Sequence, residues 1–178
     1  ISTNDVEDGQ DVFISLNSVT SSNTVSNNSC SIIIPSSDLQ NLTDGLSYTL
    51  TANVSDAAGN ESITVTSSSF LVYTSAPSIN AINTSDLSWG AVLNNIEDNS
   101  NGTVSISTVG VEDGETLSVI LNGITYSSTV SSNNCIVTIL NTDLQNLTDG
   151  QSYTLIANVS DAAGNEATTV TSSSFLVD

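Results

Sequence analysis

The chain has 178 residues, no Lys, Arg or His, and 19 Asp plus Glu, which gives a formal net charge of −19. Nucleic-acid binding and attraction to anionic lipid both need clustered cations, so we expect neither, and catalysis that depends on His or Lys is excluded. Apolar residues make up 38% of the chain, enough for a thin core, but no run of them approaches the length of a membrane span.

The excess of negative charge predicts a cation from solution. Side-chain salt bridges cannot form within this chain, so its carboxylates repel one another unless something positive binds. Hard cations such as Ca²⁺ are the best candidates, because they take carboxylate, amide and backbone oxygens as ligands. An acidic surface can also simply keep an extracellular or halophilic protein soluble, and the charge alone does not separate these two interpretations.

Identical blocks recur at a spacing of 105 residues. DAAGNE occupies 56–61 and 161–166, DLQNLTDG occupies 38–45 and 143–150, and VTSSSFLV occupies 65–72 and 170–177. A period of this length lies in the usual size range of one domain. The sequence therefore predicts tandem domains at 1–74 and 75–178, with a function set by length and stiffness rather than by one pocket.

The first repeat begins at the counterpart of the second strand of the second repeat. Ile1-Ser2-Thr3 aligns with Ile106-Ser107-Thr108, so the first domain lacks its N-terminal strand. A sandwich without that strand exposes a sheet edge, which a segment of another molecule could fill. The alternative is that the sequence begins at an arbitrary point within a longer array.

The second repeat is complete, and its short alternating runs are typical of an all-β, immunoglobulin-like β-sandwich. Val, Ile and Thr favour strands over helices. The strands are expected at 78–82, 103–108, 116–121, 124–130, 135–140, 152–160 and 168–177.

Three local features support this fold. Asn122-Gly123 predicts a two-residue hairpin, because both residues tolerate positive φ. The segment from Asp149 to Tyr153 resembles a tyrosine corner, and the segment from Asp44 to Tyr48 repeats it. Trp89 is interpreted as a plug of the core rather than a ligand platform.

Each domain has one cysteine, at matching positions. Cys30 and Cys135 are separated by a full domain, so they cannot form a disulfide with each other. A buried free thiol is the simpler interpretation, and a cross-link between neighbouring chains is the alternative.

The carboxylates of the second domain are expected to gather at one end of its sandwich. The topology places the turn with Glu112 and Asp113 near the turn with Asp161 and Asn165, beside the linker at 73–78, to which the first domain would bring Asp44. This is a candidate Ca²⁺ site, and Asp86, Glu97, Asp98 and Asp149 could form a second cluster at the far end. Asp56 and Asp161 also fit a purely structural role, as the first residue of an Asx turn.

Three long blocks carry a family resemblance: VEDGQ or VEDGE, DLQNLTDGQSYTL and ANVSDAAGNEATTVTSSSFLVD. They resemble the bacterial Ig-like extender repeats of giant RTX adhesins, a family that includes an ice-binding adhesin, and the likeness covers nearly the whole chain. In that family tandem sandwiches form a stalk, and Ca²⁺ at the linkers stiffens it.

The resemblance implies metal ligands in both repeats. These are Glu7, Asp8, Asp56 and Asn60 in the first, and Glu112, Asp113, Asp161 and Asn165 in the second. Asp178 keeps the Asp that the family usually has after the last strand, whereas the matching position of the first repeat is Tyr73. We therefore expect the internal linker to hold its ion weakly or to bind none.

The leading hypothesis is a non-enzymatic, Ca²⁺-rigidified spacer of an extracellular adhesin at the cell surface, whose partners are neighbouring repeats of the same chain. The alternative is a subunit of an extracellular filament, assembled with other copies by strand donation. An enzyme using Glu112 and Asp113 as acid and base is disfavoured, because adjacent residues on one turn rarely have the required separation.

Overall fold

Short strands make up most of the regular structure, and they confirm the all-β, Ig-like β-sandwich prediction. This computed structural model describes residues 1–178 and divides into two units, Ile1–Val72 and Tyr73–Asp178. The sequence places the boundary two residues later, after Thr74. None of the helices has the length and apolar composition needed to cross a membrane.

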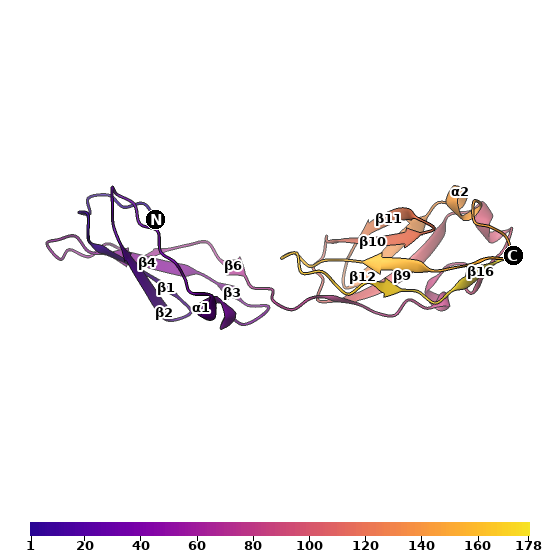
Figure 1. Ribbon diagram of the computed structural model, residues 1–178, viewed down its shortest axis with the longest axis horizontal. Coiled ribbons are helices and arrows are strands. Elements are labelled where there is room, and N and C mark those ends of the chain that lie inside the picture. The colour runs from indigo at the N-terminus through magenta and orange to yellow at the C-terminus, as the bar shows by residue number, and fades with distance from the viewer. The chain divides into compact units, whose positions relative to one another are not determined.

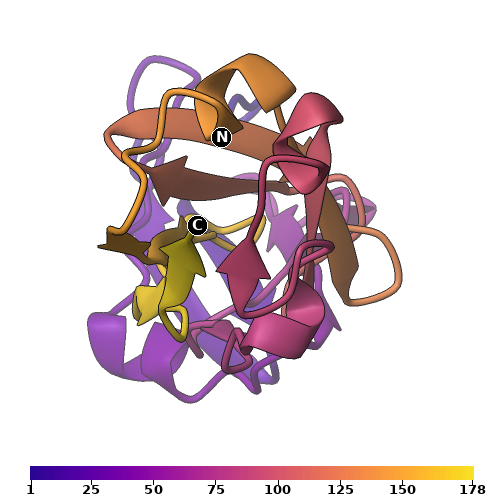
Figure 2. The same cartoon turned by 90° about the vertical axis from the view of Figure 1, so that its right-hand side faces the viewer.

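The second unit is a two-layered sandwich. One layer has the strand order β11-β10-β14-β15 and the facing layer the order β12-β9-β7, and a third, short sheet has the order β13-β16-β8 (Figure 1). Helix α2 and the C-terminus lie at the same end of this unit (Figures 1 and 2). Its elements are β7 (Ser78–Ile79), η1 (Thr84–Asp86), β8 (Val92–Leu93), η2 (Glu97–Asn99), β9 (Gly102–Val109), β10 (Thr116–Leu121), β11 (Ile124–Thr129), β12 (Asn134–Ile139), α2 (Asn141–Leu144), β13 (Ser152–Tyr153), β14 (Leu155–Asn158), β15 (Val170–Thr171) and β16 (Phe175–Val177).

The core of the second unit follows from alternation along its strands. Inward residues of β9, β10 and β12 are buried, and most residues between them are exposed or half-buried. Leu155, Ala157 and Val159 are also buried. The hairpin at Asn122-Gly123 is confirmed, with φ of 48° and 82°.

Three predicted strands are shorter or divided in the structure. The strand predicted at 152–160 divides into β13 and β14, and the one predicted at 168–177 divides into β15 and β16. The division occurs where the Leu155 N–H donates to Ser172 Oγ at 2.9 Å in place of a ladder bond. On one side of this point β13 pairs with β16, and on the other side β14 pairs with β10 and β15. The strand predicted at 78–82 ends at Ile79, because Ile82 O accepts from the N–H of Ser173 instead of bonding to β9.

The segment from Ser78 to Leu93 closes the second unit. β7 pairs with β9 in the sheet β12-β9-β7, and β8 runs parallel to β16 in the sheet β13-β16-β8. Trp89 is only 4% exposed and packs edge-on against Phe175, with ring centroids 5.3 Å apart. The interpretation of this tryptophan as a core plug is therefore confirmed.

The first unit keeps part of this plan and has a smaller covered core, because residues 29–34, the counterpart of β12, form no strand. One sheet has the order β2-β1-β4-β5, and a second pairs β3 with β6. No counterpart of β7 and β8 is present, as the sequence predicts, and only Val12, Val25 and Cys30 form its buried cluster. Its elements are β1 (Asp11–Leu16), β2 (Val19–Thr24), α1 (Ser36–Gln40), β3 (Ser47–Tyr48), β4 (Leu50–Val54), β5 (Val65–Thr66) and β6 (Phe70–Leu71).

Two further sequence features have matching structures in the repeats. The phenol oxygen of Tyr153 accepts from the N–H of Thr148 at 3.0 Å, and Tyr48 accepts from Thr43 at 2.9 Å, which confirms both tyrosine corners. Both cysteines are buried free thiols. Burial raises the pKa of Cys135, so its reactive thiolate form is disfavoured, and a cross-link between chains would first require that thiol to become exposed.

The contrast between Phe175 and Phe70 gives a stability prediction. Phe175 is 1% exposed, whereas its counterpart Phe70 is 37% exposed. Trp89 is the only tryptophan and lies in the second unit, so its fluorescence reports that unit alone. Phe175→Ala should lower the free energy of unfolding by about 3–5 kcal/mol in a urea titration followed by this fluorescence. Phe70→Ala is the matched control and should leave the transition unchanged; equal shifts in both variants would contradict this account of the core.

The acidic loop clusters, a candidate metal centre

The loop from Asp161 to Glu166 is organised around one carboxylate. Asp161 Oδ1 accepts hydrogen bonds from the N–H groups of Ala163 at 3.0 Å and Asn165 at 2.8 Å, and Oδ2 accepts from Asn165 Nδ2 at 2.7 Å. Gly164 closes the turn with a φ of 86°. The Asx-turn interpretation is therefore confirmed, and it explains why Asp, Gly and Asn are needed at this spacing.

Asp161 is a buried carboxylate, only 3% exposed, in a chain that has no cationic side chain. Burial alone would raise its pKa, but the hydrogen bonds from the side chain and N–H of Asn165 and from the N–H of Ala163 and Gly164 outweigh burial and lower the pKa. The ionised form is thus stabilised by main-chain and amide dipoles.

Glu112 joins this loop from the turn between β9 and β10. Its Oε2 accepts from the N–H of Ala162 at 2.9 Å. On the other side, Asn165 Nδ2 also donates to the carbonyl oxygen of Tyr73 at 3.1 Å, which ties the loop to the start of the unit. The predicted proximity of Glu112, Asp161, Asn165 and the linker residue Tyr73 is present within the second unit.

Asp113 points to a different loop from its neighbour Glu112. Its Oδ1 accepts from the N–H of Ser132 at 2.6 Å, in a turn where Ser132 and Asn133 have φ of 51° and 59°. The adjacent carboxylates therefore bond to separate loops, and this divergence argues against a shared acid–base role. The donor loop was not identified from the sequence, although consecutive Asn residues at 133–134 are a signal for positive φ.

The first unit repeats the arrangement. Asp56 Oδ1 accepts from Ala58 and Asn60 at 3.0 and 2.8 Å, and Glu7 Oε2 accepts from Ala57 at 3.0 Å. Asp8 Oδ1 accepts from the N–H of Asn27 at 2.8 Å. The side chain of Asn60, followed by main-chain N–H groups, lowers the pKa of Asp56. We call each set, Glu112, Asp113, Asp161 and Asn165 or Glu7, Asp8, Asp56 and Asn60, an acidic loop cluster.

The donor chemistry of these clusters suits a hard cation, but their number of ligands is limited. Carboxylate, amide and carbonyl oxygens are the ligands that Ca²⁺ takes, in groups of six to eight. No three acidic or cysteine side chains come together in a group that could hold a metal ion. Glu112 and Asp113 each use one oxygen for a main-chain donor, so their remaining lone pairs are available. Each cluster can thus supply part of a coordination sphere, with water as the natural complement.

The other predicted ligands lie outside these clusters. Asp44 is in the turn between α1 and β3, and the Asp178 N–H donates to Leu93 O at 3.0 Å; both stay predictions as ligands. The second predicted cluster does not form a group of three acidic side chains. Asp86 Oδ2 instead accepts from the N–H of Asn83, and Glu97 Oε2 accepts from that of Asn94, so both stabilise short 3₁₀ turns.

Comparison with known proteins found similar solved structures. No protein-family model and no curated protein sequence matches the chain. It is 29% identical to a Ca²⁺-stabilised adhesin that helps an Antarctic bacterium bind ice, over 98% of this chain and 41% of that one, with a TM-score of 0.49. It is also 29% identical to a very large bacterial ice-binding adhesin, over 98% of this chain and 55% of that one, with a TM-score of 0.47.

A third similar structure is a bacterial immunoglobulin-like domain from the ice-binding adhesin of M. primoryensis. It is 29% identical and covers 57% of this chain and 95% of that domain, with a TM-score of 0.40. The chain spans about half the length of the first two structures. The solved structures to which the chain is similar are thus adhesin proteins of the kind that its sequence blocks resemble.

The lowered pKa of Asp161 predicts a pH dependence of stability. Because the folded-state pKa lies below its ordinary value of about 3.9, the ionised form stabilises the folded unit above that pH, and this contribution is lost as pH falls through the folded pKa. In the Asp161→Asn variant, the side-chain NH₂ group would face Asn165 Nδ2, which is also a donor. The variant should therefore have a lower urea midpoint than the wild type at pH 7, and its midpoint should fall less than that of the wild type on acidification.

The midpoint is measured by Trp89 fluorescence between pH 7 and pH values below about 4. Protonation of the other carboxylates affects the wild type and the variant alike, so their difference isolates Asp161. Asp56→Asn changes the matching loop of the first unit and serves as the control, with no expected effect on this transition. Parallel pH profiles for the wild type and Asp161→Asn would count against the role of this carboxylate.

Proposed function

We propose that this chain is a non-enzymatic spacer of an extracellular, cell-surface adhesin, and that Ca²⁺ bound at its acidic loop clusters stiffens it. The observation that carries the proposal is the buried side chain of Asp161, which lies in the loop that Glu112 contacts and is linked to Tyr73 through Asn165. A cation near this loop would act on the segment that joins the two repeats. The partners of the chain are then neighbouring repeats of the same polypeptide.

Three further observations support a spacer. The chain repeats one sandwich at a fixed period, a plan in which length and stiffness are the useful properties. The acidic loop cluster has the same hydrogen bonds in both units, so a cation site in one implies a site in the other. The similar adhesin from the Antarctic bacterium is described as Ca²⁺-stabilised.

Net charge gives the physical reason for a stiffening effect. Nineteen carboxylates without side-chain cations repel one another, and a divalent ion removes two charges at each site that it occupies. Ca²⁺ tolerates irregular coordination and takes water with carboxylate and carbonyl oxygens, whereas Mg²⁺ needs near-octahedral geometry. The exposed loops of the acidic loop clusters therefore favour Ca²⁺.

A filament subunit assembled by strand donation between copies is the second candidate, and the uncovered face of the first unit favours it. Sedimentation velocity of the full chain distinguishes the two. A spacer stays monomeric with or without Ca²⁺, and a filament subunit forms concentration-dependent polymers.

Removal of Ca²⁺ should destabilise the chain. An ion that binds only the folded state stabilises it by about 2.7 kcal/mol at a concentration 100 times its Kd. We expect Ca²⁺ to raise the urea midpoint reported by Trp89 and a chelator to reverse this, at constant ionic strength so that screening is held fixed. Small-angle scattering of the full chain should show a narrower distribution of end-to-end distances with Ca²⁺ than with chelator.

Matched variants locate the effect. Glu112→Gln should reduce the Ca²⁺-dependent shift of the Trp89 transition, while Glu7→Gln, its counterpart in the first unit, should not. Asp11→Asn removes one charge from an exposed strand position and controls for net charge. An identical midpoint and identical scattering in saturating Ca²⁺ and in chelator would refute the proposal.

A further inference from the structure

The hairpin between β10 and β11 carries an unprotected asparagine–glycine pair at its tip. Asn122 and Gly123 are both exposed. Neither the Asn122 carbonyl oxygen nor the Gly123 N–H takes part in a hydrogen bond. A Cβ atom built on Gly123 would have no atom within 4 Å apart from its chain neighbours, so the space around this residue is open.

The turn can bring the two reacting groups together without opening the hairpin. The φ values of Asn122 and Gly123, 48° and 82°, are those of a type I′ turn. A two-residue hairpin also accepts type II′, which differs by rotation of the peptide plane between the two central residues. In type II′ the Gly123 nitrogen lies beside the side-chain carbonyl carbon of Asn122. The rotation breaks no hydrogen bond, and glycine takes either sign of φ.

We propose that Asn122 is a site of spontaneous modification, at which its amide is converted to a carboxylate through a cyclic succinimide. Asparagine is among the chemically labile residues of proteins. The Gly123 nitrogen gives up its proton and attacks the side-chain carbonyl carbon of Asn122, forming a new C–N bond. The bond to the amide nitrogen breaks, and that nitrogen leaves as ammonia with the proton. Water then adds to either carbonyl carbon of the ring and breaks its bond to nitrogen, which yields aspartate or isoaspartate.

The fold protects the other Asn-Gly pair of the chain. Asn101 Oδ1 accepts from the N–H of Asn141 at 2.9 Å, so this side chain is held in place. Gly102 is buried, begins strand β9 and packs against the ring of Trp89. Closing a succinimide there would break strand pairing and displace the indole. The sequence marks both pairs equally, and the structure selects Asn122.

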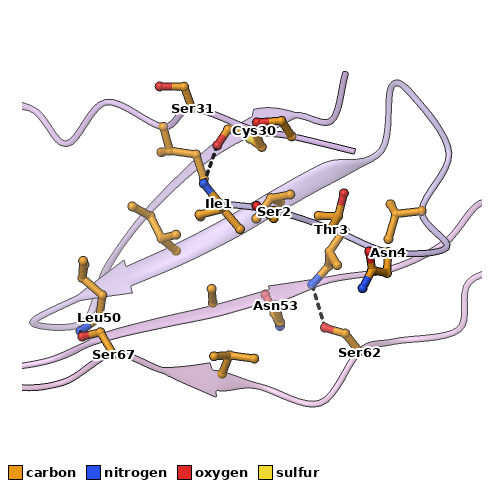
Figure 3. A pocket seen from close by; sticks show the side chains of 18 of the residues that line it. Ile1, Ser2, Thr3, Asn4, Cys30, Ser31, Leu50, Asn53, Ser62 and Ser67 are labelled. Carbon is orange, nitrogen blue, oxygen red and sulfur yellow. Dashed lines mark hydrogen bonds between the residues drawn. The ribbon is translucent and has the colours of Figure 1, made fainter. Parts of the chain in front are cut away.

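Two asparagines of the first unit each lack one requirement of the reaction. Figure 3 includes Asn53 of β4, and the dashed line at Ser62 is the bond that the N–H of the next residue, Val54, donates to Ser62 Oγ at 3.1 Å. Asn17 lies in the turn that matches the β10–β11 hairpin, with the same φ of 48°, and is followed by Ser18 with a φ of 68°. The Cβ of Ser18 crowds the nitrogen that must attack. Asn17 is therefore a control with the same turn and a slower reaction.

The modification is expected to weaken the second unit. Isoaspartate places its Cβ in the main chain, so the connection between Leu121 and Ile124 no longer fits a two-residue turn. Strand β11 also carries Tyr126, which is 9% exposed and donates from its phenol to Asp143 Oδ2 at 2.7 Å. Loosening of the hairpin thus reaches the core and α2. The hairpin lies at the end of β10 opposite the acidic loop cluster, so the inference does not depend on Ca²⁺ or on the spacer function.

Ageing of the full chain in mildly alkaline buffer tests the proposal, because the attacking nitrogen must lose its proton. Cleavage after glutamate gives the fragments 8–61, 98–112 and 116–166, which separate Asn17, Asn101 and Asn122. Mass spectrometry detects replacement of NH₂ by OH, and electron-based fragmentation locates it and distinguishes isoaspartate from aspartate. Conversion at Asn122 should be several-fold faster than at the other two sites. Conversion at Asn101 should reach a similar rate only in chain unfolded by urea.

Exchanging the following residue between the two turns gives matched variants. Gly123→Ser should slow conversion at Asn122, and Ser18→Gly should speed conversion at Asn17. Gly123→Ser is expected to fold, because the first turn already holds a serine at positive φ. The urea midpoint reported by Trp89 should fall as the wild type ages and stay constant in aged Gly123→Ser.

Equal conversion of Asn101 and Asn122 in the folded chain would overturn the proposal, since the fold would then select neither site. Conversion of Asn122 only after unfolding, or rates that are the same before and after the exchange, would overturn it as well. An unchanged Trp89 midpoint in fully converted protein would refute the effect on stability.

Discussion

Main-chain N–H groups are the positive partners that this chain provides for its loop carboxylates, since it has no Lys, Arg or His. Asp161 and Asp56 each accept two main-chain N–H bonds and one amide bond, and Glu112 and Asp113 each accept one from a neighbouring loop. These bonds set the shape of the loops at one end of each sandwich. They compensate individual carboxylates but leave the total charge of −19 in place, so a cation from solution has a defined physical role.

The two repeats act as an internal comparison. Their sequences share the acidic loops and the tyrosine corner, and the hydrogen bonds of these parts agree between the units. The units differ in the covering segment, residues 78–93, which in the second unit brings Trp89 over Phe175. They differ also in the sheet β12-β9-β7, which has no counterpart among the strands of the first unit, so the difference in core burial follows from the covering segment and this sheet together.

Much of this structure could be predicted from sequence, because its signals are local and repeated. Alternation located β9, β10 and β12, and Asn-Gly located the hairpin. The division of the last strands was missed because it depends on a tertiary bond, from the Leu155 N–H to Ser172 Oγ, which no alternating pattern encodes. Helices α1 and α2 were missed because each is a single turn, too short to show a helical period in the sequence.

The candidate site was predictable in its residue types and less so in its pairing. Spacing placed Glu112 near the Asp161 loop, but Asp113 turns to Ser132, which depends on the positive φ of residues 132–133.

Equilibrium dialysis against radioactive Ca²⁺ at physiological ionic strength tests the central claim most directly. The account predicts one ion bound at each acidic loop cluster, more weakly at the cluster beside Tyr73. Binding should resist excess Mg²⁺ and be lost in a variant with Glu7, Glu112, Asp56 and Asp161 all neutralised. Ca²⁺ retained no more strongly than Mg²⁺, and equally by that variant, would show that the carboxylates attract only a diffuse ion atmosphere.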